Sequence, residues 1–235
     1  MENFKPPETS ESPSSGDGSK FMESLKGDAG DGKTFMESLK SDTGDGKSFM
    51  ESLVNDLRLP PSGLNRAENL PPKEFTPPTG EDKERMDAAL ENFREEKWEK
   101  SSLEEKKQNM RDLADFIADE TENKNPPKMV LLDDLPNRVY GGYISEINTI
   151  VINENKLDDP TVAVDIVAHE MWHAYQHQCA MDPTSEKGRE YKDGFDNYID
   201  GKYNPEGYEN QMVEVEARDF AQVYVDELTK MEGVA

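Results

Sequence analysis

The sequence predicts an α+β domain over residues 81–235, preceded by a disordered arm over residues 1–80. Three observations lead to this prediction. The arm holds nine of the fifteen prolines and nine of the sixteen glycines, and few β-branched or aromatic residues, so it cannot bury enough apolar surface to offset the entropy of ordering. The remaining residues, about 155, suit one compact domain. Within them, apolar residues recur first at helical and then at strand spacing.

A fourteen-residue repeat occurs three times between residues 16 and 56 of the arm. Each copy contains Gly-Asp-Gly, two further residues, and then Phe-Met-Glu-Ser-Leu. Because each apolar cluster fits only about one helical turn, a single copy cannot form a domain. We predict that the copies are docking motifs for a partner protein, and that their number on one tether raises avidity. Duplication within a neutral linker is the alternative.

The folded part is predicted to begin with helices and to continue with strands. Apolar residues at helical intervals indicate a helix within residues 81–100. A second helix follows Ser102, which has the capping-box spacing to Glu105. Residues 128–132 and 140–152 are predicted strands, the second with an alternating pattern.

The most informative feature is the pentapeptide His169-Glu170-Met171-Trp172-His173. A helix places positions i and i+4 on one face, so the imidazoles of His169 and His173 could bind one Zn²⁺ ion. Glu170 would project beside them, where it could take a proton from a water molecule held by the metal. The alternative is that two surface histidines merely share a helix face.

The helix that carries this pentapeptide has a clear predicted start. Asp159 is the expected N-cap and Pro160 occupies the first turn, while the apolar residues 162–168 indicate that the helix is largely buried. His177 continues the four-residue spacing, but it lies on the order of 12 Å along the helix from His169. Zinc–nitrogen bonds are only about 2 Å long. We therefore predict that His177 is a polar residue at the helix end and not a third ligand.

A catalytic zinc ion usually has three protein ligands and one open position, so a third ligand must come from elsewhere. The candidates lie about forty residues downstream, where Glu214 and Glu216 precede the small Ala217 on a further predicted helix. The order His-Glu-x-x-His and then Glu-x-x-Ala resembles gluzincin-type zinc metallopeptidases, especially the small ImmA/IrrE-like peptidases. The resemblance covers roughly residues 100–230, and its specific part is confined to these two helices. It implies a minimal zincin-like metallopeptidase domain with Glu214 as the third ligand and Glu216 as the alternative.

The resemblance also implies a small sheet whose edge strand borders the cleft, and residues 143–153 would supply that strand. The alternative is an ordinary sheet strand that touches no substrate. The polar residues 182–211 are predicted to form a loop over the site, with Tyr203 and Tyr208 as candidate donors to an oxyanion. The chain departs from the family at Arg218, since many gluzincins have an acidic or amide residue four positions after the ligand glutamate.

Together these features predict a zinc-dependent metallopeptidase that hydrolyses a protein or peptide substrate, with Zn²⁺ as its cofactor and Glu170 as the general base. Two alternatives remain open: a zincin-like binding protein without catalysis, and a secreted toxin or effector protease. Cys179 is not a persuasive nucleophile, because on a helix it would face a different side from His177.

Charge narrows the range of partners. The chain has 51 acidic and 27 basic residues, a net charge of −24, which opposes binding to nucleic acid or to an anionic membrane. Residues 1–80 carry −5 of this charge, so −19 belongs to residues 81–235, and a cationic peptide or protein substrate is favoured. Neither a signal peptide nor a membrane span is expected. With its single cysteine, the chain is predicted to be cytoplasmic, and export by a signal-independent route is the alternative.

Overall fold

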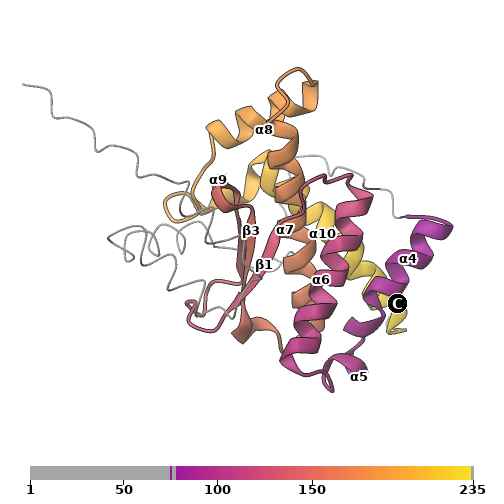
Figure 1. Ribbon diagram of the computed structural model, residues 1–235. Coiled ribbons are helices and arrows are strands. Elements are labelled where there is room, and N and C mark those ends of the chain that lie inside the picture. The colour runs from indigo at the N-terminus through magenta and orange to yellow at the C-terminus, as the bar shows by residue number, and fades with distance from the viewer. Residues whose placement is uncertain (1–74, 76–77, 234–235) are drawn as a thin grey trace, which may run out of the picture.

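The computed structural model describes residues 75 and 78–233, which form an α+β fold (Figure 1). The predicted repeats of residues 16–56 lie outside the described residues. The elements follow one another along the chain as α4 (Glu81–Leu90), η1 (Glu91–Phe93), α5 (Glu95–Trp98), α6 (Leu103–Glu120), β1 (Lys128–Leu132), β2 (Gly141–Ile144), η2 (Ser145–Ile147), β3 (Thr149–Asn153), η3 (Glu154–Lys156), α7 (Pro160–Ala180), α8 (Glu186–Asp196), α9 (Pro205–Asn210) and α10 (Met212–Met231).

Helix α7 lies in the middle of the described part, with the sheet on one side and α6 and α10 on the other (Figure 1). Every residue from Ala163 to Ala174 is buried, as expected for a helix that is apolar on most of its circumference. The predicted start is confirmed, because the side chain of Asp159 accepts a hydrogen bond from the backbone N–H of Thr161 at 2.8 Å and Pro160 occupies the first turn.

The N-terminal helices differ from the prediction, because residues 81–100 do not form one helix. The backbone of Arg94 is extended, with ψ 135°, and separates η1 from α5. The physical reason is that Phe93 and Trp98 are both fully buried and stack at 4.9 Å. In a continuous helix, residues five apart would point about 140° away from each other. The break lets both rings enter the core, where the Trp98 indole N–H donates to the carbonyl oxygen of Leu157 at 2.8 Å.

Helix α6 begins as predicted. The Ser102 hydroxyl accepts a hydrogen bond from the backbone N–H of Glu105 at 3.3 Å, and the Glu105 carboxylate accepts one from the backbone N–H of Ser102 at 2.7 Å. The capping box is therefore confirmed. Its apolar face contributes Met110, Leu113 and Ile117 to the core that α7 also lines.

The described strands form one sheet in the order β1-β3-β2, with β1 parallel and β2 antiparallel to β3. The strand predicted at residues 128–132 is confirmed, but the one predicted at 140–152 is two strands. The chain turns through η2 and through Asn148, whose φ of 47° is left-handed. The prediction that residues 143–153 form the edge strand is therefore wrong for most of that range, because β3 lies in the middle of the sheet and only the residues in β2 lie at an edge.

Strand β2 lies close against α7 because of one glycine. A Cβ atom on Gly141 would lie 2.7 Å from a methyl carbon of Ile166 and 2.9 Å from the carbonyl oxygen of Val151. Since real side chains do not approach so closely, a larger residue at position 141 would force the strand away from the helix.

The prediction that residues 182–211 form a loop is also wrong, because the segment contains α8 and α9. Both helices have side-chain N-caps: Ser185 accepts from the backbone N–H of Gly188 at 2.8 Å, and Asn204 accepts from that of Gly207 at 2.9 Å. Tyr191 on α8 is almost fully buried, and its hydroxyl donates a hydrogen bond to Glu216 on α10. The segment nevertheless borders the cleft that contains Glu170, through Phe195, Tyr198 and Tyr208.

Phe75 lies within the predicted arm but packs against the folded part. Its ring meets that of Trp172 on α7 edge-on at 4.8 Å and that of Phe220 on α10 at 5.4 Å. The packed part of the chain thus reaches further toward the N-terminus than the start of α4 at Glu81.

Among the helices of the described residues, none combines the length and the apolar character needed to cross a membrane.

Candidate metal centre

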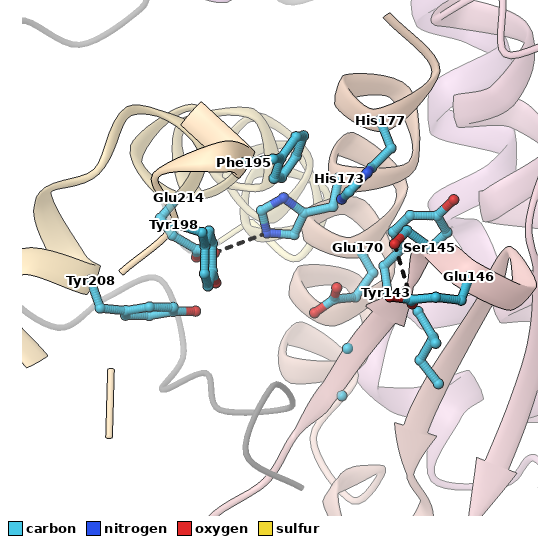
Figure 2. Close-up of a pocket in the computed structure, with 13 residues that line it drawn as sticks. Tyr143, Ser145, Glu146, Glu170, His173, His177, Phe195, Tyr198, Tyr208 and Glu214 are labelled. Carbon is cyan, nitrogen blue, oxygen red and sulfur yellow. Dashed lines mark hydrogen bonds and ion pairs between the residues drawn. The ribbon is translucent and has the colours of Figure 1, made fainter. Parts of the chain in front are cut away.

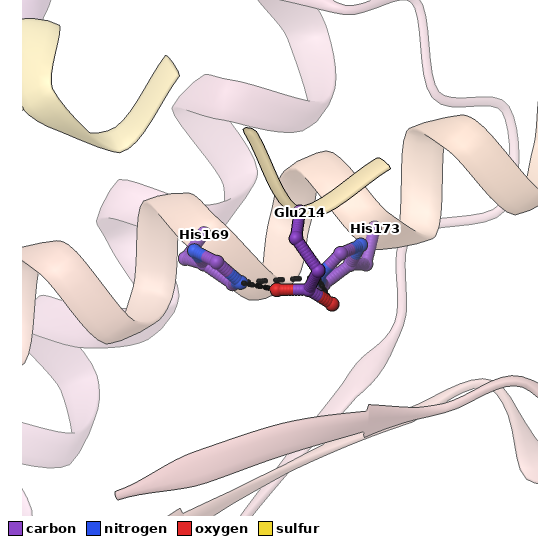
Figure 3. Close-up of side chains that lie close together, drawn as sticks. All are labelled: His169, His173 and Glu214. Atoms are coloured by element: carbon purple, nitrogen blue, oxygen red, sulfur yellow. Dashed lines mark hydrogen bonds and ion pairs between the residues drawn. The ribbon is translucent and has the colours of Figure 1, made fainter. Parts of the chain in front are cut away.

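Two helices bring three ligand-type side chains together. His169 and His173 lie one turn apart on α7, and Glu214 reaches them from the first turn of α10 (Figure 3). Helix α10 can pack closely against α7 because Ala217 and Ala221, both fully buried, add little bulk between the helices. The structure therefore places all three predicted ligands in one group.

The donor atoms have the spacing that a metal ion requires. The Nε2 atoms of His169 and His173 lie 3.0 Å apart, and the two Glu214 oxygens lie 3.5 Å from Nε2 of His169 and 3.4 Å from Nε2 of His173. A tetrahedral zinc ion with bonds of about 2 Å would hold its donors roughly 3.3 Å apart.

The chemistry of the group also fits a transition metal. All three side chains are buried, at 3%, 8% and 1% exposure for His169, His173 and Glu214. Among the described residues, the Oε2 atom of Glu214 has no hydrogen-bond partner. Two imidazole nitrogens and one carboxylate form the ligand set of many catalytic zinc sites, and imidazole favours zinc over calcium or magnesium. These three residues could therefore hold a metal ion.

Burial and mutual charge set the protonation of the group in the metal-free chain. Burial lowers the pKa of His173, but the Glu214 carboxylate outweighs this effect and raises that pKa to about 9. Burial raises the pKa of Glu214, but the charge of His173 and its contact with His169 hold it well below its usual range. These opposite shifts favour an ion pair between His173 and Glu214, whose Nε2 and Oε1 atoms lie 3.4 Å apart.

Gln176, which sequence reasoning missed, orients His173. Its Oε1 atom lies 2.8 Å from Nδ1 of His173, and its Nε2 atom donates to the carbonyl oxygen of Val213 at 3.0 Å. Because that carbonyl can only accept, the amide oxygen must face the imidazole, so Nδ1 carries a proton. In the neutral imidazole, Nε2 is then the free donor atom that faces the site. The signal available in the sequence was the i+3 spacing from His173.

Glu170 lies beside the group in a cleft of about 230 Å³ (Figure 2). Strand β2 and η2 form one wall of the cleft, α7 forms its floor, and the segment from α8 to α10 forms the other wall. One carboxylate oxygen of Glu170 accepts a hydrogen bond from the backbone N–H of Tyr143, and the other, Oε1, has no partner among the described residues. Burial raises the pKa of Glu170, although the charges of His169 and His173 lower it in part.

Two of the tyrosines between α8 and α10 face the group, and one does not. The Tyr198 hydroxyl donates to Oε1 of Glu214 at 2.7 Å, a contact that sequence reasoning missed. Tyr208 is buried in the cleft wall, and burial together with the charge of Glu214 raises its pKa well above the usual value. Tyr203, the other predicted oxyanion donor, is 77% exposed and lies outside the cleft.

The alternative third ligand has a different partner. Glu216 accepts a hydrogen bond from the Tyr191 hydroxyl at 2.6 Å, at the contact between α8 and α10. Arg218, where the chain departs from the gluzincin pattern, places its Nη1 atom 3.8 Å from Oε2 of Glu214 and donates to the carbonyl oxygen of Glu209. Of the two candidate glutamates, the geometry therefore favours Glu214.

His177 has more contact with the cleft than its position at the helix end suggested. It is not among the metal-ligand group, as predicted, but its ring lines the cleft and stacks on Phe195 at 3.7 Å. Burial and the charge of His173 lower the pKa of His177 to about 4. Cys179 is not among the residues that line the cleft.

Comparison with known proteins gives no match for this chain among family models, curated proteins or solved structures. The role of the site must therefore be inferred from its own geometry.

Proposed function

We propose that the chain is a zinc-dependent metallopeptidase with a zincin-like domain. One observation carries the proposal. Three buried donors of zinc-ligand type meet within 3.0–3.5 Å of one another, and the buried, unpartnered Oε1 atom of Glu170 lies in the cleft beside them. A purely structural metal site would have no use for a further carboxylate with an open acceptor.

The side chains have distinct roles in this proposal. His169, His173 and Glu214 would hold the ion. When bound, zinc supplies a Lewis acid that acidifies a water molecule and polarises the scissile carbonyl group. Glu170 takes the proton from the attacking water and then delivers it to the leaving amine. Burial raises the pKa of Glu170, which makes it a stronger proton acceptor than an exposed glutamate. The hydrogen bond from the Tyr143 backbone holds its carboxylate in place.

The sheet edge supports a peptide as the substrate. Among the described strands, β2 pairs with β3 alone, so its other edge is open along the cleft. An extended peptide could add to that edge through backbone hydrogen bonds, with its scissile bond close to Glu170. Tyr208, on the opposite wall, is the candidate donor to the carbonyl oxygen as it gains charge.

Metal analysis and a cleavage assay of the full chain test this proposal. We expect about one zinc ion per chain and cleavage of fluorescently labelled casein that 1,10-phenanthroline abolishes. Glu170→Gln should keep the zinc and lose about 10²- to 10⁴-fold in rate, because it removes only the proton acceptor. His173→Ala should lose both zinc and activity. Unchanged cleavage by Glu170→Gln, or a purified chain that does not bind zinc, would overturn the proposal.

The docking role of the repeats in residues 16–56 remains a prediction. We propose to test it by capturing partner proteins with Glu170→Gln, both as the full chain and after removal of residues 1–60, which leaves Phe75 in place. Partners bound through the repeats should be lost in the shortened chain. Partners that are retained would place their binding on the rest of the chain.

A further inference from the structure

One end of the cleft combines aromatic walls with an unpaired carboxylate. The rings of His177 and Phe195 stack with an interplanar angle of 19°, and the ring of Tyr143 lies 5.5 Å from that of His177. Figure 2 shows Glu146 and His177 on one side of this view of the cleft, and Tyr198 and Tyr208 on the other. The aromatic rings are held by α7, α8 and β2, so this wall is part of the folded frame.

Glu146 is the carboxylate at this end. It is exposed, follows β2 on η2, and accepts a hydrogen bond of 3.3 Å from the neighbouring Ser145 hydroxyl. In the part of the chain that the structure describes, no lysine or arginine forms an ion pair with it. Glu170 and Glu214 also line the cleft, but both are committed to the proposed chemistry. Glu146 is therefore the carboxylate that a ligand could engage.

The described lining of the cleft contains three glutamates and neither lysine nor arginine. A positively charged ligand would therefore meet no repelling lysine or arginine there. The positive charge of a metal ion would be offset by the carboxylates of Glu170 and Glu214. Among cationic side chains, the guanidinium group of arginine fits best, because it stacks on aromatic faces and pairs with a carboxylate through two parallel hydrogen bonds. Lysine fits the charge but lacks the planar geometry.

We propose that this end of the cleft is a subsite for a basic side chain of the substrate, arginine above lysine, with Glu146 as the specificity residue. The subsite rests on the proposed peptidase function and adds the substrate class to it. Glu146 follows Tyr143 by three residues, and the Tyr143 backbone contacts Glu170. Since strand residues rise about 3.3 Å each, the basic side chain would lie within about three positions of the scissile bond.

A library of quenched fluorescent peptides tests the subsite. Each pool has arginine, lysine, norleucine, glutamine or glutamate fixed at one position and random residues elsewhere, and mass spectrometry locates the cut. We expect the full chain with zinc to cleave the arginine pools fastest. Glu146→Gln should lower the preference for arginine over norleucine about fivefold, the size expected for one partly exposed ion pair. Glu146→Lys should favour the glutamate pools.

Glu104→Gln is the matched control, because Glu104 is also exposed but lies on α6, outside the cleft lining. It removes one negative charge and should leave the preference as in the wild type. An equal loss in both variants would mean that the net charge of the chain, and not a subsite, selects basic peptides.

Binding to Glu170→Gln, measured by fluorescence anisotropy, separates the two proposals. If no pool is cleaved, the peptidase proposal fails. If the arginine and glutamate pools are cleaved equally, the peptidase stands and the subsite is overturned. Equal binding of these two pools to Glu170→Gln overturns the subsite with or without cleavage.

Discussion

Gln176 offers a direct test of whether His169, His173 and Glu214 act as a metal site. Replacement by leucine keeps the size of the side chain but removes both hydrogen bonds of the amide, to Nδ1 of His173 and to the carbonyl oxygen of Val213. We expect zinc to bind about 10- to 100-fold more weakly, as is typical when the partner of a ligand histidine is lost. That range corresponds to roughly 1.4–2.8 kcal/mol.

The leucine variant should also be less stable without metal. The Nδ1–H of His173 is buried, and leaving such a donor unpaired costs about 1–3 kcal/mol. Urea unfolding of the metal-free chain measures this loss. Competition with a chromogenic chelator measures zinc affinity under conditions where both proteins are folded, so the two effects are obtained separately.

Gln178 supplies the matched control on the same helix. Its side chain accepts from the backbone N–H of Lys124 at 2.9 Å and donates to the carbonyl oxygen of Glu122 at 3.3 Å, away from the metal-ligand group. Gln178→Leu should lose some stability and keep its zinc affinity. Gln176→Glu retains an acceptor for His173 and should recover part of the affinity lost in Gln176→Leu. Zinc affinity within threefold of the wild type in Gln176→Leu would refute the proposed orienting role.

Four further outcomes are expected. Zinc must displace a proton from His173, whose pKa is raised to about 9, so calorimetry in two buffers should show proton release on zinc binding near pH 7. Zinc affinity should rise about tenfold per pH unit toward pH 9. A zinc affinity that does not depend on pH would contradict this expectation. In the metal-free chain, the same raised pKa contributes stability below pH 6.5 that is lost as the pH rises through about 9. Ala217→Leu, at a fully buried position between α7 and α10, should cost about 1–3 kcal/mol in urea unfolding, and an unchanged midpoint would argue against close packing there. Asp159→Ala should cost about 1 kcal/mol by loss of the α7 cap while Asp159→Asn retains most of it, and equal stability of the two variants would contradict the capping role.

The features that could be predicted from the sequence are those encoded locally. The start of α7 follows from Asp159 and Pro160, and the start of α6 follows from the spacing of Ser102 and Glu105. The residues of β1 form a short apolar run that is buried along most of its length. The histidine pair needed only the helical period, because a single turn brings both rings to one face.

The features that were missed depend on contacts between distant segments. Nothing near Arg94 signals a break, which becomes favourable only when Phe93 and Trp98 can both enter one core. Glu146 and Asn148, two polar residues of the turn, lie two positions apart and so also suit the exposed face of a strand, and periodicity alone could not reveal that the chain turns back on itself. The contact of Tyr198 with Glu214 spans sixteen residues of sequence and depends on the path of the chain after α8.

The two buried glutamates of the site illustrate how one environment can separate two chemical roles. Glu214 lies between two imidazoles and accepts from Tyr198, and its pKa is held well below the usual range, so it stays an anion suited to bind a cation. Glu170 has a single backbone donor and is buried, and its pKa is raised, so it is suited to take up a proton. When neighbouring acids are driven in opposite directions in this way, the one with the raised pKa is the candidate for proton transfer. A site that only bound metal would gain nothing from burying Glu170 with an open oxygen, because that arrangement destabilises the fold. The cost is understandable if the open oxygen is reserved for a water molecule that reacts.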